Sequence, residues 1–333
     1  MLRRTILARC CGGAALAAAG ACSRRERPPG TAQLLILAAP TLSMSSLWLT
    51  QELNYFKDAG IDARIEQPPG SSESIALLAG GKADVVFTAY GVPLLSAMLK
   101  GLPIRIVAGR EIASTTCGNV GAIYAMRKRF PAGLADLRVL KGKRVAINPY
   151  IGLAHFALET HLASAGMTAE DVIQIPVRAP ENVAALIGGS ADALLLITEF
   201  DRNLARVLSE TVHTSGIARY YPNLQYSHVF YGKRLLEGDV DLGRRFLAAY
   251  LRGAREFARG TTPEYMKKFA NKRAADAGEV VAACRDTFTL NGDIDLHSLQ
   301  LINDWALRRK YVTQPVEASS LVDTRFLARA HAS

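Results

Sequence analysis

Cysteine is scarce in this chain of 333 residues, and its spacing excludes a cysteine-based metal centre. The five cysteines form no Cys-x-x-Cys pair and no grouping with histidine at metal-ligand spacing. Cys117 and Cys284 are the two that lie in the body of the chain, and an isolated pair in a large domain is more often two buried thiols than a bridge. Two buried thiols are therefore favoured at these positions, with a bridge between them as the alternative, and we expect no metal site and no cofactor.

The N-terminus lacks an apolar run long enough to cross a membrane. Residues 10–21 are small and apolar, but a spanning helix needs roughly 20 such residues. Because Arg3-Arg4-Thr5-Ile6-Leu7 precedes this run, residues 1–21 have the layout of an export signal. The Arg-Arg-x-Ile-Leu core resembles the bacterial twin-arginine type, and an ordinary Sec signal that contains two arginines is the alternative.

The end of this signal resembles a lipid-attachment site. In a lipobox such as Ala19-Gly20-Ala21-Cys22, the cysteine becomes the lipidated first residue of the mature protein. Ala19 stands where such sites prefer leucine, so simple cleavage nearby is the alternative. Acylation of Cys22 would tether the protein to a membrane without a spanning helix. Residues 22–33 are polar and rich in Arg, Pro and Gly, which predicts a flexible tether.

Positive charge is in excess but is not clustered. The formal net charge is +10, and the short basic runs at residues 127–129, 141–144 and 308–310 are widely separated along the chain. Such runs are usually solvated faces, whereas nucleic-acid-binding proteins gather their basic residues on one face or one helix. We therefore expect no nucleic-acid partner, although a mild positive field would favour anionic solutes.

Length and an internal repeat both predict two lobes. The chain exceeds the size at which one hydrophobic core stops growing. The stretch Gly70–Gly91 predicts a turn, a short helix, a Gly-Gly stop, a buried strand and a second helix start. Residues 185–201 repeat this order, and superimposing the two Gly-Gly pairs places Asp192 on Asp84. Gly-Gly-x-Ala-Asp is a frequent turn, but two copies in similar helix-strand alternation indicate two lobes of similar build.

The same alternation predicts the sheet type and the ligand edge. Apolar runs at residues 34–39, 61–66 and 104–109 predict strands separated by helices, which is typical of a doubly wound parallel sheet. Ligands bind such sheets at the carboxyl ends of the strands. Helix N-termini at that edge offer N–H groups and a positive dipole end to an anion or a carbonyl-like oxygen.

Three stretches, taken in order, resemble one protein family. They are residues 41–66, which contain YFKDAGI, residues 76–87, and residues 140–167, which open with LKGKRVA. Each stretch is a weak signal alone, but their order resembles that of the periplasmic substrate-binding proteins of nitrate, sulfonate, taurine and thiamine-precursor ABC transporters. The resemblance implies an α/β, type II periplasmic binding fold, in which two doubly wound lobes joined by two crossing strands close over a solute.

The resemblance also implies where the lobes begin and end. Lobe 1 would contain residues 34–122 and 227–333, and lobe 2 would contain residues 123–226. Residues 121–127 would form the outgoing crossing strand, residues 145–148 the first strand of lobe 2 and residues 226–231 the returning strand.

Ligand contacts are expected in the loops that follow strands in both lobes. The lobe 1 candidates carry hydroxyl groups, and the lobe 2 candidates lie in two loops: Thr41, Ser43, Ser71, Ser72, Thr88 and Tyr90 in lobe 1, and Asn148, Tyr150, Glu199 and Phe200 in lobe 2. Helix capping explains the serine, threonine and glutamate positions equally well. Phe200 stands where relatives often have proline after the glutamate, so the sequence does not predict the conformation of the turn at that point.

The resemblance implies a periplasmic, non-enzymatic protein that delivers a small solute to an ABC permease with its ATPase. Helix N-termini and hydroxyl groups favour a small organic anion such as a sulfonate. Tyr90, Tyr150 and Phe200 together with Glu199 would instead suit a flat nitrogenous ring such as a pyrimidine or thiamine precursor. A ligand-sensing periplasmic subunit is a further alternative. Yeast-type pyrimidine synthases share the fold but use a reactive histidine and a cysteine-rich iron motif, and this chain has no such cysteine cluster.

Overall fold

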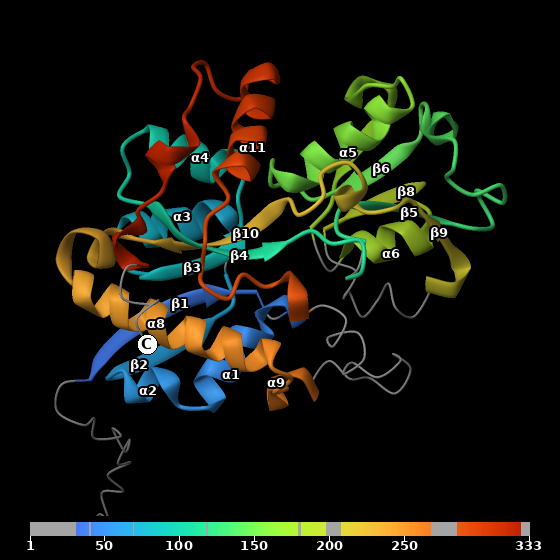
Figure 1. Ribbon diagram of the computed structural model, residues 1–333. Coiled ribbons are helices and arrows are strands. Elements are labelled where there is room, and N and C mark those ends of the chain that lie inside the picture. The colour runs from blue at the N-terminus through green and yellow to red at the C-terminus, as the bar shows by residue number, and fades with distance from the viewer. Residues whose placement is uncertain are drawn as a thin grey trace, which may run out of the picture.

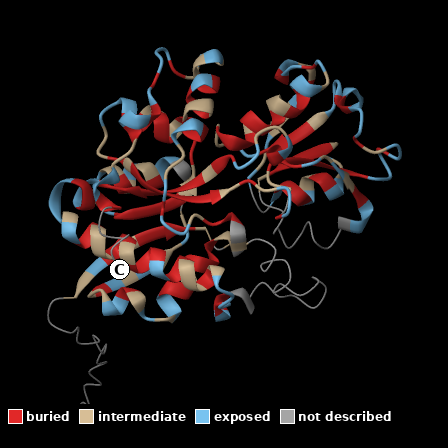
Figure 2. Cartoon of the chain, in the orientation of Figure 1, coloured by how far each residue is buried: buried red, intermediate tan, exposed pale blue. Residues whose placement is uncertain are grey.

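The strands of the protein form two sheets of five strands each in the part of the chain that the structure describes (Figure 1). The structure is a computed structural model, and it describes residues 31–39, 41–68, 70–117, 119–178, 181–197, 208–267 and 285–327. Buried residues run along the strands of both sheets, while exposed residues lie on the outer sides of the helices (Figure 2). Each sheet is therefore the centre of its own lobe.

The first sheet has the strand order β2-β1-β3-β10-β4. These strands are β1 (Ala32–Ala38), β2 (Ile61–Glu66), β3 (Val85–Ala89), β4 (Arg105–Ile112) and β10 (Gln225–Tyr231). β1 runs parallel to β2 and β3, whereas β10 is antiparallel to both β3 and β4. Neighbouring residues such as Ile36 and Leu37 are both buried, which is expected for strands that lie between two helical layers.

Helices cover both faces of the first sheet. One face packs against η1 (Leu42–Met44), α1 (Ser45–Glu52), α2 (Tyr55–Asp58), the π-helical turn η6 (Arg234–Gly238) and α8 (Val240–Ala258). The other face packs against α3 (Ser71–Ala79), α4 (Val92–Leu99) and α11 (Leu296–Arg308). The remaining short elements are α9 (Glu264–Lys267), η7 (Arg285–Thr287), η8 (Ala318–Leu321) and η9 (Thr324–Phe326). α8 buries Phe246, Leu247 and Tyr250 against this face.

The second sheet has the order β7-β6-β8-β5-β9. Its strands are β5 (Ala122–Met126), β6 (Arg144–Ile147), β7 (Ile173–Pro176), β8 (Ala193–Leu196) and β9 (Thr211–His213). β6 is parallel to β7 and β8, and β5 is antiparallel to β8 and β9. The helices α5 (Leu153–Ser164) and α6 (Glu181–Gly188) lie on opposite faces, and η2 (Leu137–Leu140), η3 (Ala169–Asp171), η4 (Leu208–Glu210) and η5 (Ile217–Arg219) connect the elements (Figure 1).

The chain crosses between the lobes twice, as predicted. It leaves the first sheet after β4 and enters the second through β5, and it returns from β9 to β10. The strands expected at residues 121–127, 145–148 and 226–231 are β5, β6 and β10, displaced by one residue at their ends. The two-lobed α/β architecture is therefore confirmed, while the exact lobe bounds stay a prediction.

One expectation about the cysteines is wrong. Cys117, in the connection between β4 and β5, is disulfide-bonded rather than a free thiol. Its partner lies outside the described residues, as do Cys22 and the expected export signal and tether up to residue 30. Sequence spacing gave no sign of the bridge because contact between distant cysteines depends on the fold. A disulfide is typical of proteins in oxidising compartments outside the cytosol.

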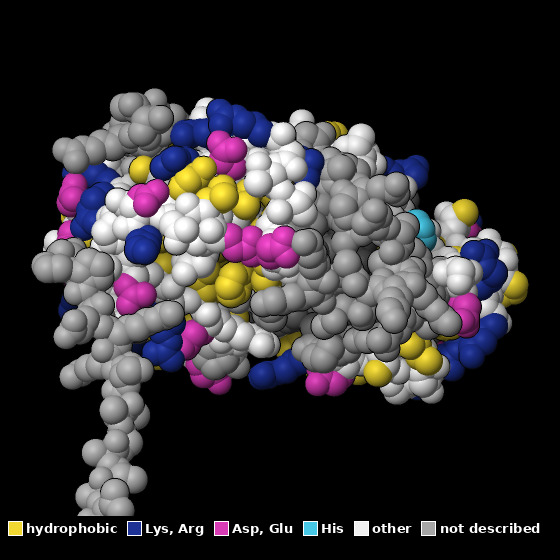
Figure 3. All heavy atoms as spheres, turned by 90° about the horizontal axis from the view of Figure 1, so that it is seen from below, with side chains coloured by type: hydrophobic (Ala, Val, Ile, Leu, Met, Phe, Trp, Pro, Cys, Tyr) yellow, Lys and Arg dark blue, Asp and Glu magenta, His cyan; other side chains and the backbone are white. Residues whose placement is uncertain are grey.

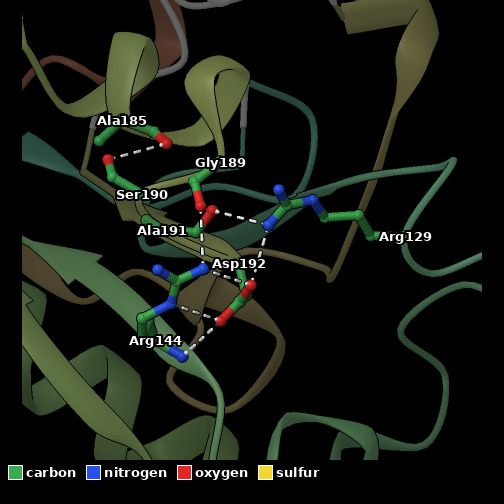
Figure 4. Close-up of polar contacts among 7 residues, drawn as sticks. All are labelled: Arg129, Arg144, Ala185, Gly189, Ser190, Ala191 and Asp192. Atoms are coloured by element: carbon green, nitrogen blue, oxygen red, sulfur yellow. Dashed lines mark hydrogen bonds and ion pairs between the residues drawn. The ribbon is translucent and has the colours of Figure 1, made fainter.

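The repeated Gly-Gly-x-Ala-Asp stretch forms the same structure in both lobes. The second glycine of each pair has a left-handed conformation, with φ of +69° at Gly81 and +80° at Gly189. Asp84 then accepts the backbone N–H of Leu35 in β1 at 2.8 Å, and Asp192 accepts that of Arg144 in β6 at 2.9 Å (Figure 4). Each aspartate thus ties the start of its strand to the neighbouring parallel strand.

Surface charge on the α1, α2, α8 and α9 side of the molecule is mixed. Figure 3 shows Lys and Arg interspersed with Asp and Glu there, and no large field of one sign among the residues drawn in colour. Most residues of the three basic runs at 127–129, 141–144 and 308–310 are exposed, as expected for solvated runs. Among the described helices, none combines the length and apolarity that a membrane crossing needs.

Candidate functional site

The carboxyl edges of the two sheets meet at the N-termini of α4 and α5. Gly91, which precedes α4, and Gly152, which precedes α5, form an antiparallel bridge between the lobes. Within this bridge, the N–H of Val92 donates to the carbonyl of Ile151 at 2.9 Å. A Cβ atom on Gly91 would lie 2.5 Å from the Tyr150 ring, so glycine is required for this approach. The loops that follow β3 and β6 therefore meet at one inter-lobe seam.

Thr41 and Ser43 lie in the loop after β1, as predicted, and they contact each other. The Thr41 hydroxyl donates to the Ser43 Oγ at 3.4 Å. Ser43 is held from the other side by Arg110, whose guanidinium donates to the Ser43 carbonyl at 2.5 Å and to its Oγ at 3.2 Å. Ser43 is thus positioned by a buried cation rather than left to a flexible loop.

The Arg110–Glu111 pair at the end of β4 was missed by the sequence interpretation. Arg110 and Glu111 are 2% and 3% exposed, and their side chains form an ion pair at 2.5 Å. Arg110 also donates to the hydroxyl of Ser227 on β10 at 2.6 Å. Burial raises the pKa of Glu111, and the neighbouring Arg110 offsets part of that rise. A charged dipeptide inside an otherwise apolar strand was the available signal. Because the two charges compensate each other, the pair places polar groups at the edge without net charge.

The other lobe 1 candidates are spread along the same edge. Ser71 begins α3, and its side chain lies outside what the structure describes, while Ser72 next to it is exposed. Thr88 is half-buried and pairs with His228 across the β3–β10 ladder. Their role as ligand contacts stays a prediction.

Tyr90 and Tyr150 lie on either side of the seam. The Tyr90 side chain is buried and its hydroxyl donates to Asn303 Oδ1 on α11 at 2.6 Å. The Tyr150 hydroxyl is buried and has no hydrogen-bond partner among the described residues. Burial raises the pKa of both phenols, so both stay protonated donors. Tyr90 is therefore committed to α11, whereas the Tyr150 hydroxyl is buried beside the backbone of Leu94 in α4.

The lobe 2 loop after β6 is organised by Asn148. Its side-chain oxygen accepts the N–H of Tyr150 at 2.8 Å, which is the capping interaction that competes with a ligand role. Arg178, which the sequence interpretation did not select, follows β7 at the same edge and is exposed. Glu199 and Phe200 lie outside the described residues, so their roles stay predictions.

His228 is a second residue that the sequence did not single out as a site residue. It is fully buried on β10, and neither ring nitrogen has a hydrogen-bond partner among the described residues. The ring lies edge-on to Tyr90, with centroids 6.3 Å apart. Burial lowers the pKa of His228 to about 3, and Arg110 adds to that effect, so the ring is neutral at physiological pH. Its position on a predicted strand did not reveal its complete burial.

Comparison with known proteins identifies the family. Residues 43–260 match the family described as NMT1/THI5 like. The chain belongs to the NMT1/THI5-like family. One relative is the 4-amino-5-hydroxymethyl-2-methylpyrimidine phosphate synthase THI5 of Saccharomyces cerevisiae, which is 30% identical over 156 residues. That match covers 46% of this chain and 42% of the yeast protein, so it spans less than half of either.

Solved structures share the fold of this NMT1/THI5-like chain. The alkanesulfonate-binding protein SsuA from Xanthomonas axonopodis pv. citri, bound to MOPS, has a TM-score of 0.66 at 17% identity, covering 90% of this chain and 99% of that one. The desulfurization enzyme DSZB has a TM-score of 0.59 at 13% identity over the same shares of the two chains. The predicted periplasmic binding fold is confirmed, and the same fold serves both binding proteins and an enzyme. Within the described residues, no group of three His, Cys, Asp or Glu side chains is placed to hold a metal ion.

Proposed function

We propose that this chain captures a small solute between its two lobes and delivers it to an ABC importer. The observation that carries the proposal is the meeting of the two carboxyl edges, where the N-termini of α4 and α5 touch through Gly91 and Gly152. Ligands of open α/β sheets bind at this edge. The periplasmic binding fold, shared with SsuA, supports the same placement.

The solute is a small organic anion such as a sulfonate. Thr41 and Ser43 supply hydroxyl groups at the lobe 1 edge, and Arg178 supplies an exposed cation at the lobe 2 edge. The buried Tyr150 hydroxyl adds a donor that has no partner of its own among the described residues. Hydroxyl and guanidinium groups can all donate to the oxygen atoms of an anion, which favours an anionic ligand.

Thermal-shift screening of the purified mature protein against sulfonates, carboxylates and pyrimidines tests this proposal. A bound compound at 100 times its Kd should add about 2.7 kcal/mol of stability. Arg178→Met should weaken an anionic hit and leave a neutral pyrimidine hit unchanged, with Arg138→Met, on the outer surface of lobe 2, as the matched control. Stabilisation by none of the three classes would contradict capture of these solutes.

A second candidate is a protein that binds a pyrimidine or thiamine precursor. The 30% identity to the yeast pyrimidine phosphate synthase favours it. In this case a pyrimidine should give the largest shift in the screen. Mass spectrometry for 4-amino-5-hydroxymethyl-2-methylpyrimidine phosphate after incubation of the purified protein separates binding from synthesis, because only a synthase would accumulate this product.

Delivery to a transporter requires a location outside the cytoplasm, and the lipid anchor is part of this proposal. Acylation of Cys22 would hold the protein at the membrane that contains the permease. Mass spectrometry of the membrane-bound protein should then find an acylated N-terminal cysteine, and Cys22→Ser should release the protein into the soluble extracytoplasmic fraction. Retention of Cys22→Ser in the membrane fraction, or an unmodified N-terminal cysteine on the membrane-bound protein, would contradict the lipid anchor.

A further inference from the structure

The two lobes share one hydrophobic cluster on the side of α4, α5 and α11. This cluster includes Leu95 of lobe 1 and Leu158 of lobe 2, and it continues through the buried Trp305 of α11. The Trp305 ring lies edge-on to Phe156 of α5, with centroids 6.0 Å apart. The lobes are therefore joined by side-chain packing in addition to the two crossing segments.

Polar contacts reinforce this packing. The indole N–H of Trp305 donates to Glu159 Oε2 on α5 at 2.9 Å, and Arg309 forms an ion pair with Glu159 Oε1 at 3.2 Å. Arg309 also donates to Glu170 in lobe 2 at 2.9 Å. The Glu159 side chain is 20% exposed and that of Glu170 is 67% exposed. Glu159 is therefore the shielded acceptor on which the contact depends, whereas the solvated Glu170 pair contributes little.

The first half of α11 belongs firmly to lobe 1. The N–H of Asp295, the cap of α11, donates to Gln225 on β10 at 2.9 Å. Asn303 receives the hydroxyl of Tyr90 and donates to the carbonyl of Val316 at 2.9 Å. Trp305 and Arg309 lie just beyond these anchors, so only the end of the helix reaches across to lobe 2.

We propose that the C-terminal end of α11 is a latch, in which Trp305 and Arg309 hold Glu159 and keep the lobes in the closed arrangement where Gly91 and Gly152 touch. This inference rests on the proposed function, because the equilibrium between open and closed lobes sets the affinity of the solute site. Rotation of lobe 2 away from α11 would expose the Trp305 ring and separate Glu159 from both of its partners. Closure is therefore stabilised without any solute.

The first experiment needs no solute. The N–H of Val92 donates to Ile151 across the seam, so its hydrogen exchange, measured by NMR, reports separation of the lobes. Glu159→Leu and Arg309→Met should each accelerate this exchange, by roughly tenfold for Glu159→Leu, and increase the radius of gyration in solution scattering. The N–H of Leu95, which donates to Gly91 within lobe 1, is the internal control. Unchanged Val92 exchange in both variants would overturn the latch.

A control variant tests whether loss of any ion pair would accelerate the exchange. Arg138→Met breaks an exposed ion pair with Asp136 that lies wholly within lobe 2. It should leave Val92 exchange and the radius of gyration at their wild-type values. Arg309→Met leaves α5 intact, so the conclusion does not depend on whether Glu159→Leu folds well. Equal acceleration in Arg138→Met would contradict a specific latch.

The second experiment uses MOPS as the solute. Glu159→Leu and Arg309→Met should weaken MOPS binding roughly fivefold in calorimetry. Without the latch, a smaller fraction of the protein is closed before binding, which lowers the apparent affinity. Tighter binding would show that the contact holds the lobes apart and would overturn the proposal. If the wild-type protein does not bind MOPS, the proposed sulfonate site fails, and the solute-free experiment still decides the latch.

Discussion

Asp84 in lobe 1 and Asp192 in lobe 2 occupy equivalent positions in a repeated turn, yet their electrostatic surroundings differ. Both carboxylates accept a backbone N–H from the neighbouring parallel strand. The Asp84 side chain is 6% exposed, and burial raises its pKa even though Leu35 and Arg234 lower it in part. The Asp192 side chain is 19% exposed, and its pKa falls to about 2, chiefly because the Arg144 guanidinium donates to it.

Comparison of Asp84 with Asp192 shows which contacts of the repeated turn recur in both lobes. The backbone contact recurs because the glycine turn delivers each aspartate to the same place beside a strand, while the arginine partners come from unrelated segments. Arg234, from the turn after β10, lies 3.3 Å from Asp84. Arg144 and Arg129, which belong to lobe 2 alone, lie 3.0 Å and 2.9 Å from Asp192 (Figure 4). A local sequence signal therefore predicts the geometry but not the charge balance.

The largest expected effect is that of Asp84→Ala. It leaves the N–H of Leu35 buried without an acceptor and removes the ion pair with Arg234, so we expect a loss of about 3 kcal/mol in the free energy of unfolding. Urea denaturation measures it, with Asp136→Ala as an exposed control that should cost less than about 0.5 kcal/mol. If Asp84→Ala loses no more unfolding free energy than the control, the contacts of Asp84 with Leu35 and Arg234 do not stabilise the protein, and the comparison fails.

Asp192→Ala should cost less, about 2 kcal/mol, because water can reach the groups that it leaves unpaired. The N–H of Arg144 loses its acceptor, but both arginine side chains remain partly solvated. The same denaturation experiment gives the ranking. If Asp192→Ala destabilises the protein more than Asp84→Ala, burial is not what distinguishes the two sites.

The two left-handed glycines give a smaller contrast. Gly81→Ala should cost about 1 kcal/mol from backbone strain alone, because nothing lies within 4 Å of the added Cβ. Gly189→Ala carries the same strain and also displaces the Arg129 guanidinium that pairs with Asp192. We expect Gly189→Ala to be the more destabilising in thermal unfolding, and to lose that excess when Arg129→Met is already present.

The smallest effect is confined to acidic solution. Asp192 has a lowered folded pKa, so its contribution is complete above the unfolded value of 3.8 and declines as the pH falls toward 2. The stability gap between wild type and Asp192→Asn should therefore shrink, with its charge-dependent part reduced to about half at pH 3. Buried histidines such as His228, with a pKa of about 3, also lose stability in acid, but they do so equally in both proteins.

Asp84 should show the opposite sign. Its raised folded pKa means that the protonated form is favoured on folding, so this contribution is present below pH 3.8 and is lost as the pH rises through the folded value. Denaturation of Asp84→Asn across the same pH range checks this slope. Parallel pH dependence in the two asparagine variants would show that the carboxylates do not differ.

Much of the fold followed from pattern. The strands predicted from apolar runs at residues 34–39, 61–66 and 104–109 appear as β1, β2 and β4, because apolar runs and turn residues act locally. The strands that the family resemblance implied at residues 121–127, 145–148 and 226–231 appear as β5, β6 and β10. The candidate site was only partly predictable. Thr41, Ser43 and Tyr150 lie at the expected edges, but Tyr90 is engaged by Asn303, which is 213 residues away in the chain. For Arg110 and Glu111 the signal was a charged dipeptide within an apolar strand, whereas the burial of His228 had no local signal.

The sequence by itself determined the two α/β lobes and the alternation of strands and helices within them, since this alternation depends on spacing between residues close in the chain. Only the tertiary structure decided that Cys117 is bridged, that Arg110 is neutralised by Glu111 in a buried setting, and that α11 reaches Glu159 of the other lobe. These features join segments far apart in sequence or depend on exclusion of water. No local pattern encodes them, because burial and long-range contact arise only when the lobes pack together.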